Sequence, residues 1–148
     1  MLSEEMHKVV IDTNVIVSSL IQKNFPYKIM TELFIEDKIK LCVSEALLKE
    51  YYDVLQRPKF AVYYDFTVRA KSLLADIEEK ATVFTPLISL NLMSDKGDNK
   101  ILELADVCAA DYIVTGNTND FTFSTYKNTQ IVTPKTYWFE FESKNYYN

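Results

Sequence analysis

Short apolar runs alternate with longer helix-forming stretches along this chain, and the alternation limits the fold more than any other feature. Runs typical of buried strands cover residues 8–12, 40–43, 81–85, 112–115 and 130–132. Stretches with apolar residues at helical spacing cover residues 15–21, 27–36, 45–57, 65–79, 98–110 and 134–142. Strands that alternate with helices predict a three-layer α/β/α sandwich with a mostly parallel central sheet.

Local signals predict where several helices begin and end. Ser44 suits the N-cap of the helix that stops before Pro58, and Asp65 suits the cap of the next one. Thr133 and Pro134 form a cap followed by proline at the first helical position. In the helix after Asp65, the residues expected to face inward are Val68, Leu73, Leu74 and Ile77.

The size and composition predict a single domain over residues 1–148. Apolar residues make up 48% of the chain, enough for a core without disulfides. Cys42 and Cys108 lie in apolar runs, so we favour two buried reduced thiols over a disulfide. The sequence has no apolar run of about 18 residues and no basic, apolar leader at its start. We therefore expect a cytoplasmic protein with no membrane partner.

Scarce residue types exclude several kinds of site. Gly97 and Gly116 are the only glycines, so a glycine-rich phosphate loop is excluded. His7 is the only histidine, which excludes a histidine-rich zinc site. The net charge of -5 argues against gripping nucleic acid by bulk electrostatics alone. Catalysis, if present, must rest mostly on carboxylates.

Four carboxylates occupy positions that suggest one site. Asp12 ends the first strand, Asp98 begins a helix, and Asp120 follows the strand at 112–115. Ligands collect beyond the carboxyl ends of parallel strands, which is where these three fall. The fourth acid is Glu50, which shares a helix face with the apolar residues Leu47 and Val54. Each acid also has an ordinary explanation, such as helix capping for Asp12.

Taken together, the four acids indicate a site for hard divalent cations. Mg²⁺ and Mn²⁺ prefer carboxylate oxygen ligands. Such ions lower the pKa of a bound water and stabilise a phosphoryl transition state. With a single histidine in the chain, a metal-activated water is the natural nucleophile.

Four segments, in order, resemble the PIN domain, a nuclease-like fold. They are VVIDTNVIVSSL, VSEALLKEYYDVLQRPKF, DNKILELADVCAADYIVTGNTNDF and IVTPKTYWFEF. Among PIN domains the chain is most similar to the toxin components of bacterial toxin–antitoxin pairs, the VapC-like ribonucleases. The resemblance implies a Mg²⁺- or Mn²⁺-dependent endoribonuclease that hydrolyses RNA phosphodiesters, a small antitoxin partner and a homodimer.

The resemblance also assigns roles to individual residues. The family's catalytic, metal-binding acids fall on Asp12, Glu50, Asp98 and Asp120. Thr13 and Asn14 match the family's DTN motif, and Asn14 and Thr115 become supporting polar groups, with capping as an equal alternative. Two positions depart from the family pattern: Asn117 stands where relatives often have Asp, and Gly97 where they often have an acid.

Substrate contacts are less visible in the sequence. Arg57 and Lys59 form the clearest basic spot, and Lys100 lies close to Asp98 in the chain. Other candidates for phosphate contact, for most of which a solvated surface charge is the favoured explanation, are Lys49, Arg69, Lys71 and Lys96. Aromatic residues that could stack on bases, although core packing explains them better, are Phe121, Phe123 and Tyr126. The aromatic segment 137–147 is expected to pack partly on the sheet and to leave an interaction surface.

Two other functions stay open. Asp12 could be the nucleophile of an aspartate-phosphorylating α/β domain, such as a phosphatase or a response-regulator receiver. Phosphatases of that kind usually need a second aspartate where this chain has Asn14. Alternatively, a catalytically degenerate PIN fold could bind RNA or a protein partner. Asn117 and the acidic net charge support the degenerate alternative.

Overall fold

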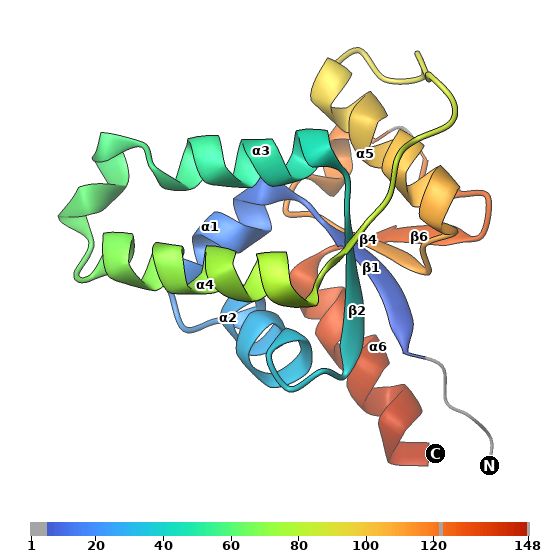
Figure 1. Cartoon of the computed structure of the whole chain (residues 1–148). Coiled ribbons are helices and arrows are strands. Elements are labelled where there is room, and N and C mark those ends of the chain that lie inside the picture. The colour runs from blue at the N-terminus through green and yellow to red at the C-terminus, as the bar shows by residue number, and fades with distance from the viewer. Residues whose placement is uncertain (1–5, 122, 148) are drawn as a thin grey trace.

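The computed structural model describes residues 6–121 and 123–147, and in them one mostly parallel sheet lies between layers of helices (Figure 1). Its strands are β1 (His7–Ile11), β2 (Ile39–Val43), β3 (Thr82–Val83), β4 (Tyr112–Val114), β5 (Thr125–Tyr126) and β6 (Thr129–Val132). They lie in the order β3-β2-β1-β4-β6-β5, and only the β5–β6 pair is antiparallel. The predicted three-layer α/β/α architecture is confirmed.

The helical segments connect these strands. They are α1 (Thr13–Ile21), α2 (Phe25–Lys28), the π-helical turn η1 (Ile29–Phe34), α3 (Glu45–Leu55), the 3₁₀ turn η2 (Pro58–Val62), α4 (Phe66–Lys80), α5 (Lys96–Cys108), the 3₁₀ turn η3 (Thr118–Asp120) and α6 (Pro134–Tyr147). Helix α3 begins as predicted, with the Ser44 hydroxyl accepting a 3.1 Å bond from Leu47 N–H. None of the described helices is long and apolar enough to cross a membrane.

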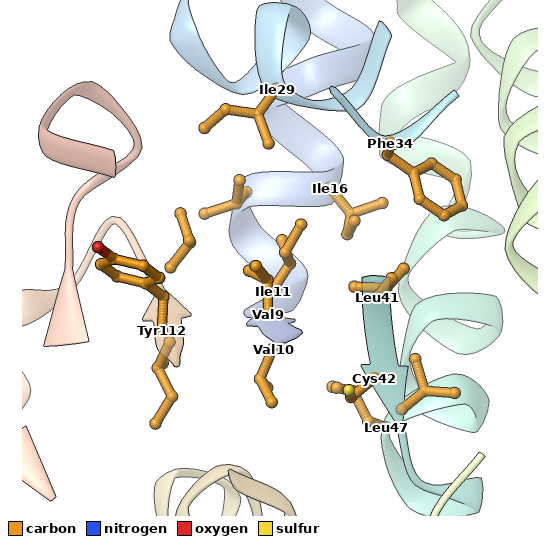
Figure 2. Packing of buried hydrophobic residues seen from close by; sticks show 14 of the residues in the cluster. Val9, Val10, Ile11, Ile16, Ile29, Phe34, Leu41, Cys42, Leu47 and Tyr112 are labelled. Carbon is orange, nitrogen blue, oxygen red and sulfur yellow. The ribbon is translucent and has the colours of Figure 1, made fainter. Parts of the chain in front are cut away.

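The core lies on both faces of the central strands β1 and β2. Alternate residues point to opposite faces, so Val10 and Cys42 lie on one side and Val9 and Leu41 on the other (Figure 2). The thiol of Cys42 meets that of Cys108 on α5, and both are buried and free, as the sequence predicts. The buried aliphatic side chains each stabilise the fold by roughly 1.5–3 kcal/mol.

Several elements differ from the sequence prediction. The strand predicted over residues 81–85 shortens to Thr82–Val83, because Pro86 has no N–H to continue the ladder. The helix predicted over residues 27–36 is α2 followed by η1, whose last turn closes with an Ile35 N–H bond to the Met30 carbonyl, 3.0 Å long. Strand β5 was not predicted.

Helix α4 corrects the predicted orientation of Val68 and shows how Asp65 precedes the helix. Val68 is 66% exposed, because it lies off the stripe that Ala70, Leu74 and Ile77 bury. Asp65 occupies the N-cap position as predicted, but its φ of 54° is left-handed and its side chain makes no capping hydrogen bond; its backbone carbonyl accepts from Arg69 N–H at 3.0 Å. The inward positions of Leu73, Leu74 and Ile77 are as predicted.

The parallel strands place their carboxyl ends at one edge of the sheet. Ile11, Val43 and Val114 end β1, β2 and β4 there. Asp12 N–H continues the pairing with a 3.0 Å bond to the Val114 carbonyl. Helices α1 and α3 therefore begin beside each other at this edge, immediately after Asp12 and Ser44.

Candidate active site

A pocket of about 470 Å³ opens at the carboxyl edge of the sheet and gathers the four predicted acids. Asp12, Glu50, Asp98 and Asp120 all line it, although they come from four different segments of the chain. Asp95 lines it as well. The remaining lining residues are Thr13, Asn14, Val17, Ser18, Val54, Phe60, Gly97, Ile101 and Asn117.

Asp12 serves as a helix cap and as a pocket residue at the same time. Its Oδ1 accepts a 2.8 Å hydrogen bond from Thr13 N–H, which caps α1. Its Oδ2 accepts a 2.8 Å bond from the hydroxyl of Thr115. Burial raises the pKa of Asp12; these two bonds oppose the rise, whereas the nearby Glu50 and Asp120 add to it. Capping and a functional role are thus compatible at this position.

Glu50 reaches the pocket from α3. The sequence pattern suggested a buried face, but Glu50 is exposed at the pocket rim, one helical turn from buried Leu47. Its carboxylate accepts a short hydrogen bond from the Thr13 hydroxyl, which links α3 to the start of α1. The neighbouring Tyr51 fixes the helix on the sheet, because its buried hydroxyl donates a 2.5 Å bond to the carbonyl of Ile11.

Asp98 lies in the first turn of α5, and Asp95 caps that helix. The Oδ1 of Asp95 accepts from Gly97 N–H at 2.7 Å and from Asp98 N–H at 3.3 Å. The pKa of Asp98 rises to about 6, first through burial and then through repulsion from Asp95, Asp12, Asp120 and Glu50. Sequence reasoning missed Asp95. The sequence signal that could have indicated Asp95 is an aspartate three residues before Asp98, at the position of a helix N-cap.

The loop after β4 completes the pocket. Asp120 ends η3, is exposed, and lines the pocket with Asn117. The Asn117 N–H donates to the Thr115 hydroxyl at 3.1 Å, so that hydroxyl bridges the loop and Asp12. Asn14 accepts a long 3.5 Å bond from Gly116 N–H. The predicted supporting residues therefore all lie at the pocket or directly behind it.

The residues present fit a hard divalent cation. Five carboxylates line the pocket, and the described residues that line it include no Lys or Arg to balance them. Burial, and then the charge of the neighbouring acids, raises the pKa values of Asp12 and Asp98, and a bound cation would oppose both effects. The carboxylates are not already closed into a cage: in residues 6–121 and 123–147, no three His, Cys, Asp or Glu side chains are arranged to hold an ion.

The predicted basic residues lie around the pocket and not in it. Arg57 and Lys59 are exposed and flank the first residue of η2, a turn from which Phe60 lines the pocket. Lys100 lines a smaller hollow that adjoins the pocket through Glu50. Two weaker candidates are engaged elsewhere, because Lys49 pairs with Asp53 at 2.7 Å and Arg69 donates to the carbonyls of Leu20 and Tyr64.

Most of the aromatic residues considered for base stacking belong to the core. Phe121 is buried, Phe123 packs against the core, and the Tyr126 hydroxyl donates to Asp106 at 3.1 Å. In the carboxyl-terminal segment, Tyr137 and Trp138 are buried whereas Phe139 is 51% exposed. The expectation that this segment packs partly on the sheet is confirmed.

Comparisons with known proteins agree with the fold. A family model described as the PIN domain matches residues 8–119. The uncharacterized protein MJ1680 of Methanocaldococcus jannaschii is 35% identical over 111 residues, 74% of this chain and 70% of that protein. The structure of VapBC2 from Rickettsia felis bound to a DNA fragment from their promoter is similar in fold, with a TM-score of 0.53 and 17% identity over 85% of this chain and 98% of that one.

Proposed function

The chain belongs to the PIN domain family, and from that premise we propose that it is a Mg²⁺- or Mn²⁺-dependent endoribonuclease that hydrolyses RNA phosphodiester bonds. The observation that carries the proposal is the pocket at the carboxyl edge of the sheet. Asp12, Glu50, Asp98 and Asp120 converge there from separate segments, and the lining residues that the structure describes offer no cationic side chain. A cluster of carboxylates without a cationic side chain beside it favours the binding of cations.

The four carboxylates have two proposed roles. Asp12, Glu50 and Asp98 are the proposed metal ligands, and Asp120 helps directly or through water. A bound divalent ion lowers the pKa of its water and offsets the charge of a phosphoryl transition state. Thr115 and Thr13 orient the ligands, since their hydroxyls donate to Asp12 and Glu50. Asn14 and Asn117 line the pocket and offer amides to the sugar–phosphate chain.

The proposal extends to the substrate and to partners. Arg57, Lys59 and Lys100 contact RNA phosphates around the pocket. By analogy with VapBC2, whose structure holds the complex on promoter DNA, we propose a small antitoxin as a partner. From the resemblance to PIN-domain toxins we propose a homodimer as the working form. The chain then works as one PIN-like domain over residues 1–148, acting in the cytoplasm.

Cleavage of RNA with and without divalent metal tests this function. Wild-type protein is incubated with structured and unstructured RNA in Mg²⁺, Mn²⁺ or EDTA, beside Asp12→Asn. We expect metal-dependent cleavage that falls at least 100-fold in Asp12→Asn while the circular dichroism spectrum is retained. Asp53→Asn is the matched control, because Asp53 is an exposed acid paired with Lys49 outside the pocket. Equal cleavage by wild type and Asp12→Asn would overturn the proposal.

A second candidate is a degenerate PIN fold that binds RNA or a protein without cutting. Two points favour it: Asn117 lines the pocket at a position where the family resemblance leads us to expect an acid, and no three of the described acidic side chains are arranged to hold an ion. A metal titration by calorimetry, on wild type and Asp98→Ala, separates the two functions. A nuclease binds Mn²⁺ through Asp98, and a pure binding module has no such requirement.

A further inference from the structure

The acidic pocket carries an apolar surface that metal binding and phosphate chemistry do not need. Val17 of α1, Val54 of α3 and Phe60 of η2 line it together with the acids. All three are partly exposed. Apolar lining beside a charged centre indicates a ligand with both an ionic and a flat or apolar part. A nucleotide has both, in its phosphate and its base.

Phe60 is held so that its ring has a fixed position. The ring stacks on Phe66, with centroids 5.0 Å apart and an interplanar angle of 22°. Phe66 is itself buried, so it anchors the pair in the core. The turn that carries Phe60 begins at Pro58 and closes with a 3.1 Å bond from Phe60 N–H to the Arg57 carbonyl. A ring already ordered in this way loses little entropy when a base stacks on it.

The charges around Phe60 match a nucleic-acid strand. Arg57 and Lys59 are exposed on the same short segment, and the Lys59 ammonium lies 5.2 Å from the Phe60 ring centroid. A base that stacks on the ring would displace the Lys59 ammonium, which lies over it, and the adjoining phosphate would lie near the acids of the same pocket. Lys59 has a flexible stem that can move from the ring to a phosphate.

We propose that Phe60, with Val54 and Val17, forms a stacking site for one unpaired nucleobase next to the scissile phosphate. A base within a duplex keeps its faces stacked on its neighbours and is not free to lie on the ring. Stacking on an aromatic side chain accepts any base, so this site selects strand state more than sequence. This inference rests on the proposed function, because it places a base of the proposed RNA substrate in the same pocket.

Binding of short oligoribonucleotides tests the stacking site without requiring cleavage. Fluorescence anisotropy is measured in Ca²⁺, which takes the same oxygen ligands, with an eight-nucleotide single strand and with a duplex. We expect Phe60→Ala and Phe60→Leu to bind the single strand about 10-fold more weakly than wild type, and Phe60→Tyr to bind it like wild type. Phe60→Leu keeps an apolar contact with Phe66. A loss of RNA affinity in that variant is therefore due to the loss of base stacking and not to unfolding. Phe139→Ala removes an exposed phenylalanine on α6 and serves as the control.

A single abasic nucleotide, moved along the strand, locates the base. At one position it should weaken wild-type binding about 10-fold and abolish the difference between wild type and Phe60→Leu. Unchanged affinity in both Phe60→Ala and Phe60→Leu would overturn the stacking site even if RNA is cleaved. If wild type cleaves nothing but its binding still depends on Phe60, the proposed nuclease function fails and the stacking site stands.

Discussion

The hydroxyl of Thr115 donates a 2.8 Å hydrogen bond to the carboxylate of Asp12, and so joins the residues that directly follow β4 and β1. Thr115 is fully buried, and its oxygen also accepts from Asn117 N–H at 3.1 Å. One buried hydroxyl therefore orients a proposed metal ligand and holds the loop that carries Asp120.

Thr115→Val tests this link, because valine keeps the shape of threonine and removes the hydroxyl. We expect Mn²⁺ affinity to fall about 10-fold, as is usual when a partner of a metal ligand is lost. The free energy of unfolding should fall by about 1–2 kcal/mol, since Asn117 N–H loses its acceptor. Calorimetric titration and thermal denaturation measure the two effects. Thr115→Ser retains the hydroxyl and should behave like wild type; equal Mn²⁺ binding by Thr115→Val would contradict the assigned role.

Removing the charge of Asp98 should stabilise the metal-free protein. Burial and the neighbouring acids raise the pKa of Asp98 from 3.8 to about 6, so its ionised form is disfavoured in the folded state. The loss of stability that the ionised Asp98 causes is complete well above pH 6. It disappears as the pH falls through 6 toward 4, because the carboxyl group takes up a proton. In EDTA at pH 7.5, Asp98→Asn should therefore be more stable than wild type by about 1 kcal/mol after solvent screening, or about 3 °C in Tm.

The same variant should lose the response to metal. Mn²⁺ should raise the Tm of wild type and have little effect on that of Asp98→Asn, because a ligand bound only to the folded state stabilises it. Differential scanning fluorimetry across pH and Mn²⁺ concentration measures both effects. Asp53→Asn, which changes an exposed acid, is the control. A lower Tm for Asp98→Asn in EDTA at pH 7.5 would show that the pocket acids do not repel one another as described.

The sequence predicts the central strands and the pocket acids for one physical reason. Apolar runs such as residues 8–12 can be buried on both faces only in a parallel sheet, and that sheet brings Asp12 and the chain after β4 to one edge. Glu50 gives a different signal, because it shares a helix face with the apolar residues Leu47 and Val54, and the family resemblance then assigns it to the same site.

Other features depend on tertiary contacts that the sequence pattern does not contain. Strand β5 has two residues, and the Lys127–Asp106 ion pair next to it joins its turn to α5. Asp95 caps α5, a role that an aspartate before a helix commonly has. That Asp95 also lines the pocket depends on the fold. The sequence does not distinguish Phe60 from the other aromatic residues, since its stacking on Phe66 depends on how the α3–α4 connection turns.

Tyr51→Phe should destabilise the protein and disturb the pocket together. The Tyr51 hydroxyl is fully buried and donates a 2.5 Å bond to the Ile11 carbonyl, which directly precedes Asp12. Its loss should lower the free energy of unfolding by about 1–2 kcal/mol. Because this bond fixes α3 on β1 next to Glu50, Mn²⁺ affinity should also fall a few-fold. Urea denaturation and metal titration measure the effects, with Tyr64→Phe, an 87% exposed tyrosine, as the control. A variant as stable as wild type would show that the bond contributes nothing.

His7 should make stability fall in mild acid. Burial, and then the charge of Lys144, lowers the pKa of His7 below its ordinary 6.5, although Asp111 and Glu140 oppose the shift. Its Nδ1 lies 3.2 Å from the hydroxyl of buried Tyr137.

His7 takes up a proton more readily in the unfolded chain than in the folded protein. Above pH 6.5 the imidazole is neutral in both states, and His7 then does not oppose folding. Stability is lost as the pH falls from 6.5 through the folded pKa. The Tm difference between wild type and His7→Gln, measured every half pH unit from 8 to 5, should therefore shift against wild type below pH 6.5. Carboxylates common to both proteins cancel in this difference. A Tm difference that stays constant over the whole range would mean that His7 titrates alike in the folded and unfolded states.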